Sequence, residues 1–243
     1  LWIAESQMMK ETEEIVHMHL EFLPLTSYAN IVEGNALSVD WESVVPKDKL
    51  NYIMGNPPFV GARLMEKPQK DDMSLVFGKL KGVGNLDYVS AWYKKAADLI
   101  KNTEIRVAFV STNSITQGEQ TAILWKPIME SGIVINFAWR TFKWESQSND
   151  QAAVHCVIVG FSCTPGDKAK KLYQGGQVAH VVKNVNAYLL DAPDIFVLNR
   201  SKALCNIPAV NYGSFALDDG NYTISEKEYA ELKQADADID LFI

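Results

Sequence analysis

Apolar residues along the chain follow two spacings, one typical of helices and one typical of strands. Recurrence at three- and four-residue intervals predicts amphipathic helices over residues 1–23, 85–100 and 119–131. Short apolar runs bounded by turn-forming residues predict strands over residues 30–32, 50–54, 106–111, 133–139 and 152–161. The polar, glycine-bearing segment 61–84 is expected to be a loop. Strands that alternate with helices predict an α/β fold with a doubly wound sheet that ends in an antiparallel hairpin.

Single residues indicate where some of these elements begin and end. Asn85 is expected to cap the second helix, and Pro127 predicts a kink or an early end in the third. Gly175-Gly176 separates two further strand-like runs and indicates a second hairpin. The remaining residues, 191–243, are expected to form a turn-rich connector with a short helix near 225–234.

The composition is that of an ordinary folded domain. Apolar residues make up 47% and charged residues 22% of the 243 positions, which excludes a disordered or low-complexity chain. No run of about 18 apolar residues occurs, so no membrane span is predicted. The three cysteines lack the spacing of a disulfide framework or zinc site, which favours a reducing cytoplasm and no bound metal.

The net charge of -7 lies mostly at the C-terminal end. Residues 218–243 hold eight acids and two bases, so residues 1–217 are almost neutral. Electrostatic steering depends on the local field, and a nearly neutral body can carry a basic face. The global charge therefore does not exclude a nucleic-acid partner.

The tetrapeptide Asn56-Pro57-Pro58-Phe59 directly follows the predicted strand 50–54. One interpretation is a plain turn, because Asn-Pro and Pro-Pro are common in turns. The other is a ligand site, because open α/β sheets bind ligands at the carboxyl ends of their strands. The two prolines stiffen the backbone and remove two N–H donors. The groups that remain are acceptors, namely the Asn56 side-chain oxygen and the backbone carbonyls.

Such a set of acceptors suits a planar base with an exocyclic amino group. The base would donate both amino hydrogens to the acceptors and stack on Phe59. Its amino nitrogen would then be held as a nucleophile in front of an electrophile. A base inside a duplex cannot enter a pocket of this kind, so it would have to be flipped out of the helix.

The tetrapeptide and its surroundings resemble an amino-group DNA methyltransferase of the adenine-N6 type. The chain is more closely similar to the methyltransferase part of the MmeI-like bifunctional restriction-and-modification enzymes, over nearly its whole length. NPPF alone is shared with protein-glutamine and RNA methyltransferases, whereas the combination of segments is more specific. These segments are LWIAESQM (1–8), IVEGNAL (31–37), NPPF (56–59), Trp144 with AAVH (152–155), and NAYLLDAP (186–193).

The resemblance implies a catalytic role for Asn56, Pro57, Pro58 and Phe59. Asn56 and the Pro57 carbonyl would bind the target amino group, and Phe59 would stack on the adenine. The reaction would be an in-line transfer of a methyl group from the sulfonium of S-adenosylmethionine to nitrogen. Catalysis would rest on positioning and electrostatics rather than on a covalent intermediate.

The resemblance also implies roles for residues outside the tetrapeptide. Asn35 and Ala36 stand where the family contacts the adenine ring of S-adenosylmethionine, although a plain turn residue is the alternative for Asn35. Phe142 and Trp144 are candidates for the aromatic side chain that closes the target-base pocket from the other side. Ordinary hairpin packing is the alternative for both, since aromatic residues favour strands.

The sequence departs from the family on its N-terminal side. The family has a glycine-rich turn after its first strand and an acid at the end of its second, and neither precedes Leu1. Gly82-Val83-Gly84 does not replace the turn, because it does not follow a predicted strand. We therefore expect 1–164 to be a Rossmann-like methyltransferase core without its first two strands. Residues 165–243 would lead toward a target-recognition domain, and the chain alone would bind S-adenosylmethionine weakly or not at all.

These observations predict part of a bacterial restriction-modification enzyme that methylates a flipped adenine in double-stranded DNA. Its partners would be the DNA and the remaining domains of a parent chain, with target recognition beyond Ile243. One alternative is an RNA or protein-amide methyltransferase. A second alternative, from another class, is a non-catalytic DNA-binding or interaction module.

Overall fold

The computed structural model describes residues 2–17, 30–144, 154–163, 169–175, 179–200, 205–206 and 224–235. The chain divides into two compact units, Leu1–Leu198 and Asn199–Ile243, and each is described by itself. The second unit contains the helix α6 (Glu226–Ala235), which confirms the short helix predicted near 225–234. Ser225 and Glu228 bond to each other at its start.

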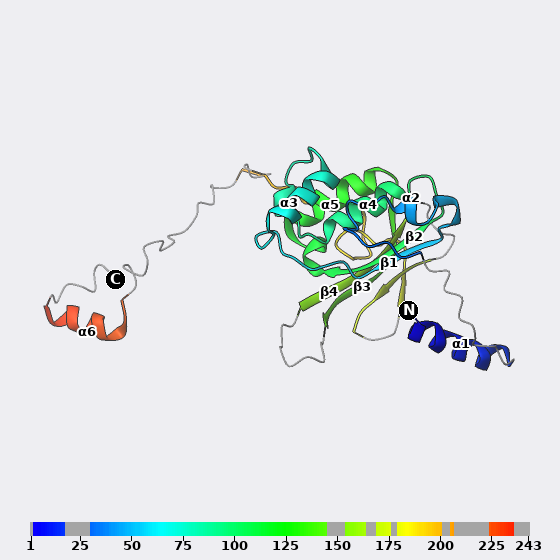
Figure 1. Ribbon diagram of the computed structural model, residues 1–243. Helices are drawn as coiled ribbons and strands as arrows, with labels where there is room; N and C mark the ends of the chain where they lie inside the picture. The colour runs from blue at the N-terminus through cyan, green and yellow to red at the C-terminus, as the bar shows by residue number, and fades with distance from the viewer. Residues whose placement is uncertain are drawn as a thin grey trace. The chain divides into compact units, whose positions relative to one another are not determined.

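Six strands of the described residues form one mixed sheet in the first unit (Figure 1). They are β1 (Tyr52–Gly55), β2 (Arg106–Thr112), β3 (Val134–Trp144), β4 (Val154–Ser162), β5 (Lys170–Tyr173) and β6 (Ala179–Val182). Their order is β1-β2-β4-β3-β5-β6. The β1–β2 and β3–β5 pairs are parallel, and the other neighbours are antiparallel. The α/β class and both predicted hairpins are confirmed, and the sheet continues through β5 past residue 164.

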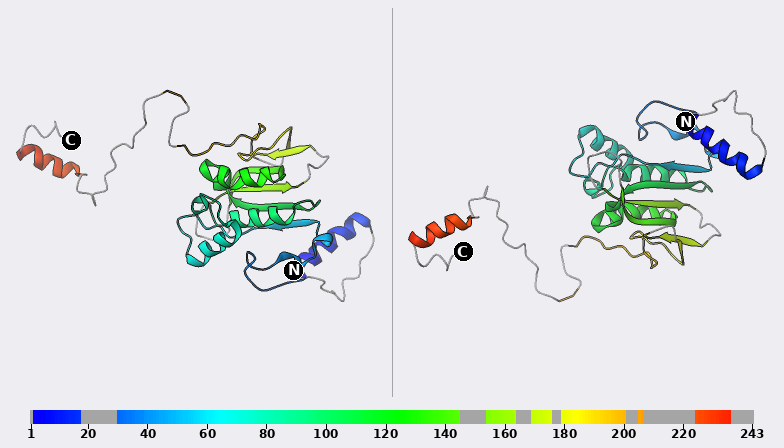
Figure 2. Two further views of the ribbon diagram at one scale, coloured as in Figure 1. Left: turned by 90° about the horizontal axis from the view of Figure 1, so that it is seen from above. Right: turned by 90° about the horizontal axis from the view of Figure 1, so that it is seen from below.

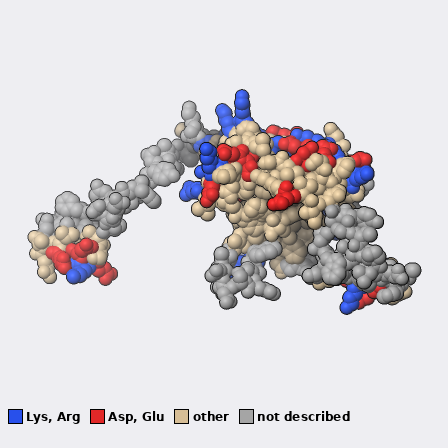
Figure 3. Space-filling model, in the orientation of Figure 1, with Lys and Arg blue, Asp and Glu red and all other residues tan. Residues whose placement is uncertain are grey.

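The helices α3 (Lys67–Phe77), α4 (Ser90–Leu99) and α5 (Gly118–Glu130) lie over one face of the sheet (Figures 1 and 2). The helix α1 (Trp2–Val16) and the single turn α2 (Trp41–Val44) precede β1. On the side shown in Figure 3, charged side chains of this unit gather over the helices, whereas the described surface over the strands is mostly uncharged. No helix in the described ranges has both the length and the apolar character of a membrane span.

The face of the sheet opposite these helices is the more open one. Along β2 the residues at every second position are buried, among them Val107 and Phe109, and those between them are partly exposed. On β1, Tyr52 and Met54 are 62% and 78% exposed, while Ile53 packs against the core. A parallel strand pair is normally buried on both faces. The described helices therefore cover one of the two faces that are normally buried in such a pair.

Four buried aromatic rings join the helical layer to the sheet. Tyr93 of α4 stacks on Phe161 of β4, with ring centroids 5.6 Å apart, and meets Phe109 and Trp125 edge-on. The Tyr93 hydroxyl lies 2.9 Å from Ser111 Oγ and donates to the Phe109 carbonyl. Burial raises the pKa of Tyr93 far above its usual range, with the Ser111 bond acting in the opposite direction. The phenol therefore stays protonated and holds α4 against the middle of β2.

The segment 61–84, predicted to be a loop, contains the helix α3, so that prediction is wrong. Glu66 caps this helix through a capping box, in which its backbone N–H donates to the Gln69 side chain over 2.9 Å. Met73 and Phe77 are buried four residues apart, as on one face of a helix. The pattern was hard to recognise because a Glu takes the cap position usually held by Ser or Thr, and the apolar stripe is short.

The predicted strand 30–32 is irregular in the structure, and that prediction is also wrong. Ile31 is 78% and Val32 54% exposed, and neither pairs with a strand of the described sheet. A strand exists only where a neighbour accepts and donates its backbone hydrogen bonds. An apolar run carries no information about whether that neighbour is present.

Three smaller predictions concerned the ends of helices. α1 covers most of the predicted helix 1–23, of which residues 18–23 lie outside the described residues. Asn85 closes a 3-10 turn (Val83–Asn85) and does not cap α4, whose N-cap Val89 has no side-chain bond. α5 continues past Pro127 to Glu130, so the expected early end is wrong. A proline this near the end of a helix removes only one of the last backbone bonds.

We predict that Gly160→Ala destabilises the sheet by about 1–3 kcal/mol. A Cβ at this position would lie 2.0 Å from the ring of Phe137, the residue opposite it on β3, so the ring would have to move. Urea unfolding of the chain measures the loss of stability. Gly84→Ala is the matched control, because a Cβ there meets nothing within 4 Å. Replacing Phe137 by Ala should relieve the penalty, and additive effects of the two changes would contradict the contact.

Candidate active site

The tetrapeptide Asn56–Phe59 leaves the carboxyl end of β1, where the sequence predicted it. β1 runs parallel to β2 with Gly55 opposite Phe109, which fixes the point at which the loop begins. Asn56 and Pro58 are exposed, Pro57 is buried, and Phe59 is half-buried and packs against the core. The Asn56 side chain is therefore accessible while the backbone beneath it is anchored.

A pocket of about 420 Å³ lies at this loop. It is lined by Trp41, Ile53, Met54, Gly55, Asn56, Pro57, Pro58, Trp92 and Phe109. Two tryptophans from separate helices thus share a pocket with the tetrapeptide. Trp92 lies within the predicted helix 85–100 and Trp41 within no predicted element, and nothing in the spacing shows that α2 and α4 meet at β1. A pocket with flat aromatic walls and amide oxygens can hold a planar, amino-bearing ring.

The predicted cofactor residues Asn35 and Ala36 begin a compact turn. The Asn35 backbone carbonyl accepts from the N–H groups of Ser38 and Val39, each at 2.9 Å, and its side-chain oxygen accepts from Leu37 N over the same distance. The Ala36 carbonyl accepts from the indole nitrogen of Trp41 at 2.7 Å. Trp41 therefore links this turn to the pocket at Asn56, and the structure brings these two predicted parts of the site together.

Lys95 of α4 holds the same turn from the other side. Its ammonium donates to the backbone carbonyls of Ala36, Leu37 and Val39 at 3.0, 2.8 and 2.5 Å, and lies 5.2 Å from the centre of the Trp41 ring. Burial lowers the pKa of Lys95, and the charge of Asp40 acts in the opposite direction. The sequence did not single out Lys95, although its spacing from Tyr88 and Trp92 places it on an aromatic helix face.

Asp72 of α3 fixes the orientation of the Asn35 side chain. The Asn35 amide nitrogen donates to both carboxylate oxygens of Asp72 at 2.9 Å, so its amide oxygen must face the other way. Tyr88 donates to the same carboxylate at 2.6 Å. Burial, together with this bond, raises the pKa of Tyr88 far above its usual range, which keeps the hydroxyl a donor. The orientation of the Asn35 side chain is thus fixed, and its role in cofactor binding stays a prediction.

The two predicted aromatic residues of the base pocket lie toward the end of β3. Phe142 pairs with Cys156 and Trp144 with Val154 across the hairpin. The Phe142 ring contacts Trp139, which stacks on Tyr173 of β5. Phe142 is not among the residues that line the pocket at Asn56, and the side chain of Trp144 lies outside the described residues, as does the segment 145–153. Their role in base binding stays a prediction.

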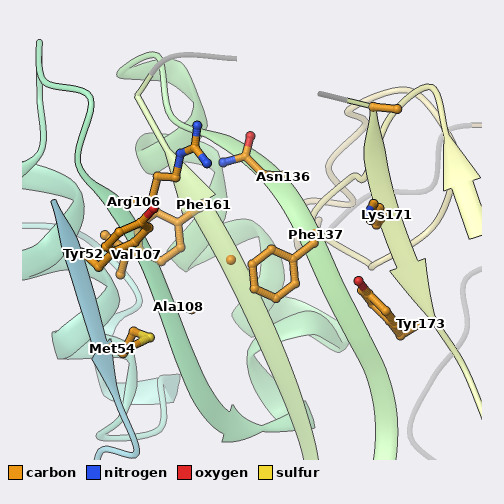
Figure 4. Close-up of a pocket in the computed structure, with 12 residues that line it drawn as sticks. Tyr52, Met54, Arg106, Val107, Ala108, Asn136, Phe137, Phe161, Lys171 and Tyr173 are labelled. Atoms are coloured by element: carbon orange, nitrogen blue, oxygen red, sulfur yellow. The ribbon is translucent and has the colours of Figure 1, made fainter. Parts of the chain in front are cut away.

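A second pocket, of about 380 Å³, lies on the more open face of the sheet (Figure 4). Tyr52 and Met54 of β1 form one side of it and Tyr173 of β5 the other, with Phe137 between them. The lining includes no carboxylate and no histidine. No group of three potential metal ligands occurs among the described residues either.

Comparisons with known proteins identify the family of the chain. Residues 1–174 match the family model for the DNA-methyltransferase domain of MmeI. The DNA methyltransferase A of Bacillus subtilis (strain 168) is 40% identical over 235 residues, which are 95% of this chain and 26% of that protein. The structure of the Type IIL restriction-modification enzyme MmeI in complex with DNA is 41% identical, with a TM-score of 0.86. That match covers 98% of this chain and 32% of the MmeI chain.

The match defines a DNA-methyltransferase domain, and the resemblance inferred from the tetrapeptide is confirmed. The chain belongs to the family of MmeI DNA-methyltransferase domains. It spans about a quarter of the length of DNA methyltransferase A and about a third of that of MmeI.

We predict that Lys95→Met loosens the turn at residues 35–39 without unfolding α4. Methionine keeps the length of the side chain but leaves three carbonyls without their charged donor, and such bonds contribute about 1.5–3 kcal/mol each. Hydrogen exchange at Ser38 and Val39 should become at least about ten times faster. Lys94→Met is the matched control, because the neighbouring Lys94 pairs with Asp98 instead. Equal exchange rates in the two variants would contradict this role of Lys95.

Proposed function

We propose that this chain is the catalytic part of a restriction-modification DNA methyltransferase that methylates the N6 amino group of a flipped adenine. The observation that carries the proposal is the exposed Asn56 at the carboxyl end of β1, in a pocket shared with Trp41 and Trp92. Membership of the family supports DNA as the substrate. DNA methyltransferase A and the DNA complex of MmeI support the same assignment.

The residues of the pocket would act by positioning. The Asn56 amide oxygen and the Pro57 carbonyl would accept the two hydrogens of the amino group. These two hydrogen bonds would direct the nitrogen lone pair toward the incoming methyl group, while Phe59 would stack on the base. Phe142 and Trp144 would close the pocket from the hairpin side. Such orientation of the reacting groups supplies much of the rate enhancement in group transfer.

S-Adenosylmethionine would supply an electrophilic methyl group bound to a sulfonium. The residues of the 35–39 turn fit its adenine ring, because Asp72 holds Asn35 with the amide oxygen as an acceptor for an amino group. No hydrogen bond within the described residues uses the backbone N–H of Ala36, which leaves one donor for a ring nitrogen. Asn35 and Ala36 would thus bind the amino group and a ring nitrogen of the adenine.

The proposal extends to the architecture of the parent protein. The order β1-β2-β4-β3, with β4 antiparallel, suits a Rossmann-like methyltransferase sheet. The outer edge of β1 would pair with one of the two cofactor-binding strands of the family. Because a parallel sheet is normally covered on both faces, further elements would lie over the exposed Tyr52 and Met54. In this arrangement 1–164 is the catalytic core, and 165–243 connects toward the domain that reads the DNA sequence.

We predict that Asn56→Ala in the full-length protein lowers kcat for methyl transfer by at least about 10²-fold, because one of two acceptors is lost. Transfer of labelled methyl to double-stranded DNA measures the rate, and mass spectrometry of the digested DNA identifies N6-methyladenine as the product. Asn51→Ala is the matched control, since Asn51 lies exposed at the opposite end of β1.

The outcomes of this assay separate the alternatives. Transfer to RNA or to a protein amide in place of DNA would favour the other enzyme classes. Methylation that persists unchanged in Asn56→Ala would contradict the catalytic assignment. A full-length protein that binds DNA and transfers no methyl group would favour a non-catalytic module.

We predict that this chain alone binds S-adenosylmethionine with a Kd weaker than about 100 μM. The 35–39 turn would bind the adenine ring, but Gly82-Val83-Gly84 follows α3 rather than a strand, so it does not match the family's glycine-rich turn. Isothermal titration calorimetry measures the affinity. Binding at micromolar concentration would refute the prediction and would require another cradle for the methionine part.

A further inference from the structure

Asp87 is a buried carboxylate that the proposed chemistry does not use. It lies just before α4 and is 6% exposed. Its Oδ1 accepts from the backbone N–H of Ala62 and from the Gln120 side chain, both at 3.1 Å, and its Oδ2 accepts from the Thr112 hydroxyl at 2.9 Å. Its own backbone N–H donates to Gln120 at 3.1 Å. The side chain thus joins three segments: the loop after the tetrapeptide, the carboxyl end of β2, and the start of α5.

The partners of Asp87 are all neutral, and no ion pair of this residue occurs among the described residues. Burying a carboxylate without a cation is unfavourable unless hydrogen bonds replace its water. Three donors do so here, and each of them comes from a different element. Removing Asp87 would therefore leave three polar groups unpaired at once, which makes the contact a strong constraint on where these elements lie.

Among the described residues, hydrogen bonds attach the end of the loop that carries the tetrapeptide to one neighbouring segment, Asp87 and Tyr88. Pro57 and Pro58 have no N–H to donate. Within residues 56–62, the hydrogen bonds to other elements go to two neighbouring residues. The Val60 carbonyl accepts from Tyr88 N at 2.9 Å, and Ala62 N donates to Asp87. The position of Asn56 is therefore set by β1 on one side and by Asp87 and Tyr88 on the other.

The space beside this loop would allow it to move. A hollow of about 760 Å³ is lined by the end of the loop, Gly61 to Leu64, together with Asp87 and the first residues of α5. Phe59 and Val60 pack against the core, and the Val60 carbonyl bonds to Tyr88 N. At the end of the loop, where Ala62 lines the hollow, the bond to Asp87 limits movement into it. A displacement of about 1 Å at a reacting group can lower a rate by about 10²-fold.

We propose that Asp87 is a positioning residue for methyl transfer, which holds Asn56–Phe59 at the distance from Trp41 and Trp92 that the reaction needs. This inference rests on the proposed function. It differs from a purely structural role in one measurable respect. Loss of a contact that positions the catalytic loop lowers kcat and leaves the affinities for DNA and cofactor nearly unchanged. General destabilisation instead lowers the amount of active protein.

The test uses Asp87→Ala in the full-length protein. We expect kcat to fall by about 10²-fold, with KM for DNA and Kd for S-adenosylmethionine within about threefold of wild type. Asp87→Asn should recover most of the rate, because the amide keeps an acceptor for Ala62 and offers a donor to Thr112. Equal kcat in Asp87→Ala and wild type would overturn the proposal, as would an Asp87→Asn protein as slow as Asp87→Ala.

A second pair of variants covers the case in which Asp87→Ala does not fold. Thr112→Val removes one of the three donors, and we expect kcat to fall by about three- to tenfold. Thr121→Val is its matched control, because the buried Thr121 hydroxyl has no partner among the described residues. Equal rates in these two variants would overturn the proposal.

Hydrogen exchange separates failure of this inference from failure of the proposed function. We expect the Ala62 amide to exchange at least about ten times faster in Asp87→Ala, or in Thr112→Val, than in wild type, with exchange in β2 unchanged. A wild-type protein that transfers no methyl group to DNA would refute the proposed function, and the exchange result would still show whether Asp87 holds the loop. Unchanged exchange at Ala62 would overturn the positioning role of Asp87 even where the wild type is active.

Discussion

The burial of Tyr93 between the sheet and α5 is the contact on which the geometry of the site depends. It anchors α4 to β2 through an aromatic cluster and through the bond to Ser111. α4 carries Lys95, which holds the 35–39 turn, and the residues before α4, Asp87 and Tyr88, hold the loop after the tetrapeptide. Both parts of the site, the 35–39 turn and the loop after the tetrapeptide, are therefore held in place by α4 and the residues just before it. A shift of α4 along the sheet would move the turn and the loop together rather than separate them.

Most of the fold followed from local pattern, and the exceptions have physical reasons. The run 106–111 predicted β2 correctly, because a strand at the centre of a sheet needs apolar side chains whatever its neighbours are. The run 30–32 has the same character but no partner in the described sheet, and Ile31 stays exposed. The helix α3 was missed because it is held by its capping box and by Asp72, which bonds to Asn35, rather than by a long apolar stripe.

Part of the candidate site could likewise be predicted from local pattern, and part of it could not. Asn56–Phe59 was found from the sequence because the tetrapeptide is contiguous and follows a strand. The residues that hold it were not found, because their partners are distant in the chain: Lys95 contacts a turn 56 or more positions earlier, and Asp87 bonds to Ala62 across 25. Polar residues at such separations have no periodicity to reveal them. Their types are also common on exposed helix faces, which is the ordinary interpretation of a Lys or an Asp.

The two prolines connect the chemistry of the loop with its need for outside support. Pro57 and Pro58 leave acceptors facing the pocket because they have no N–H, and for the same reason the loop cannot tie itself to the sheet through its own backbone at those positions. Stiff φ angles limit the shape of the loop but not its place in the molecule. A neighbouring segment therefore has to fix that place. The buried carboxylate of Asp87 does so by accepting a hydrogen bond from the N–H of Ala62, a few residues after the two prolines. The absence of N–H groups at the two prolines, which suits the tetrapeptide to binding an amino group, thus explains why a buried carboxylate with neutral partners lies beside it.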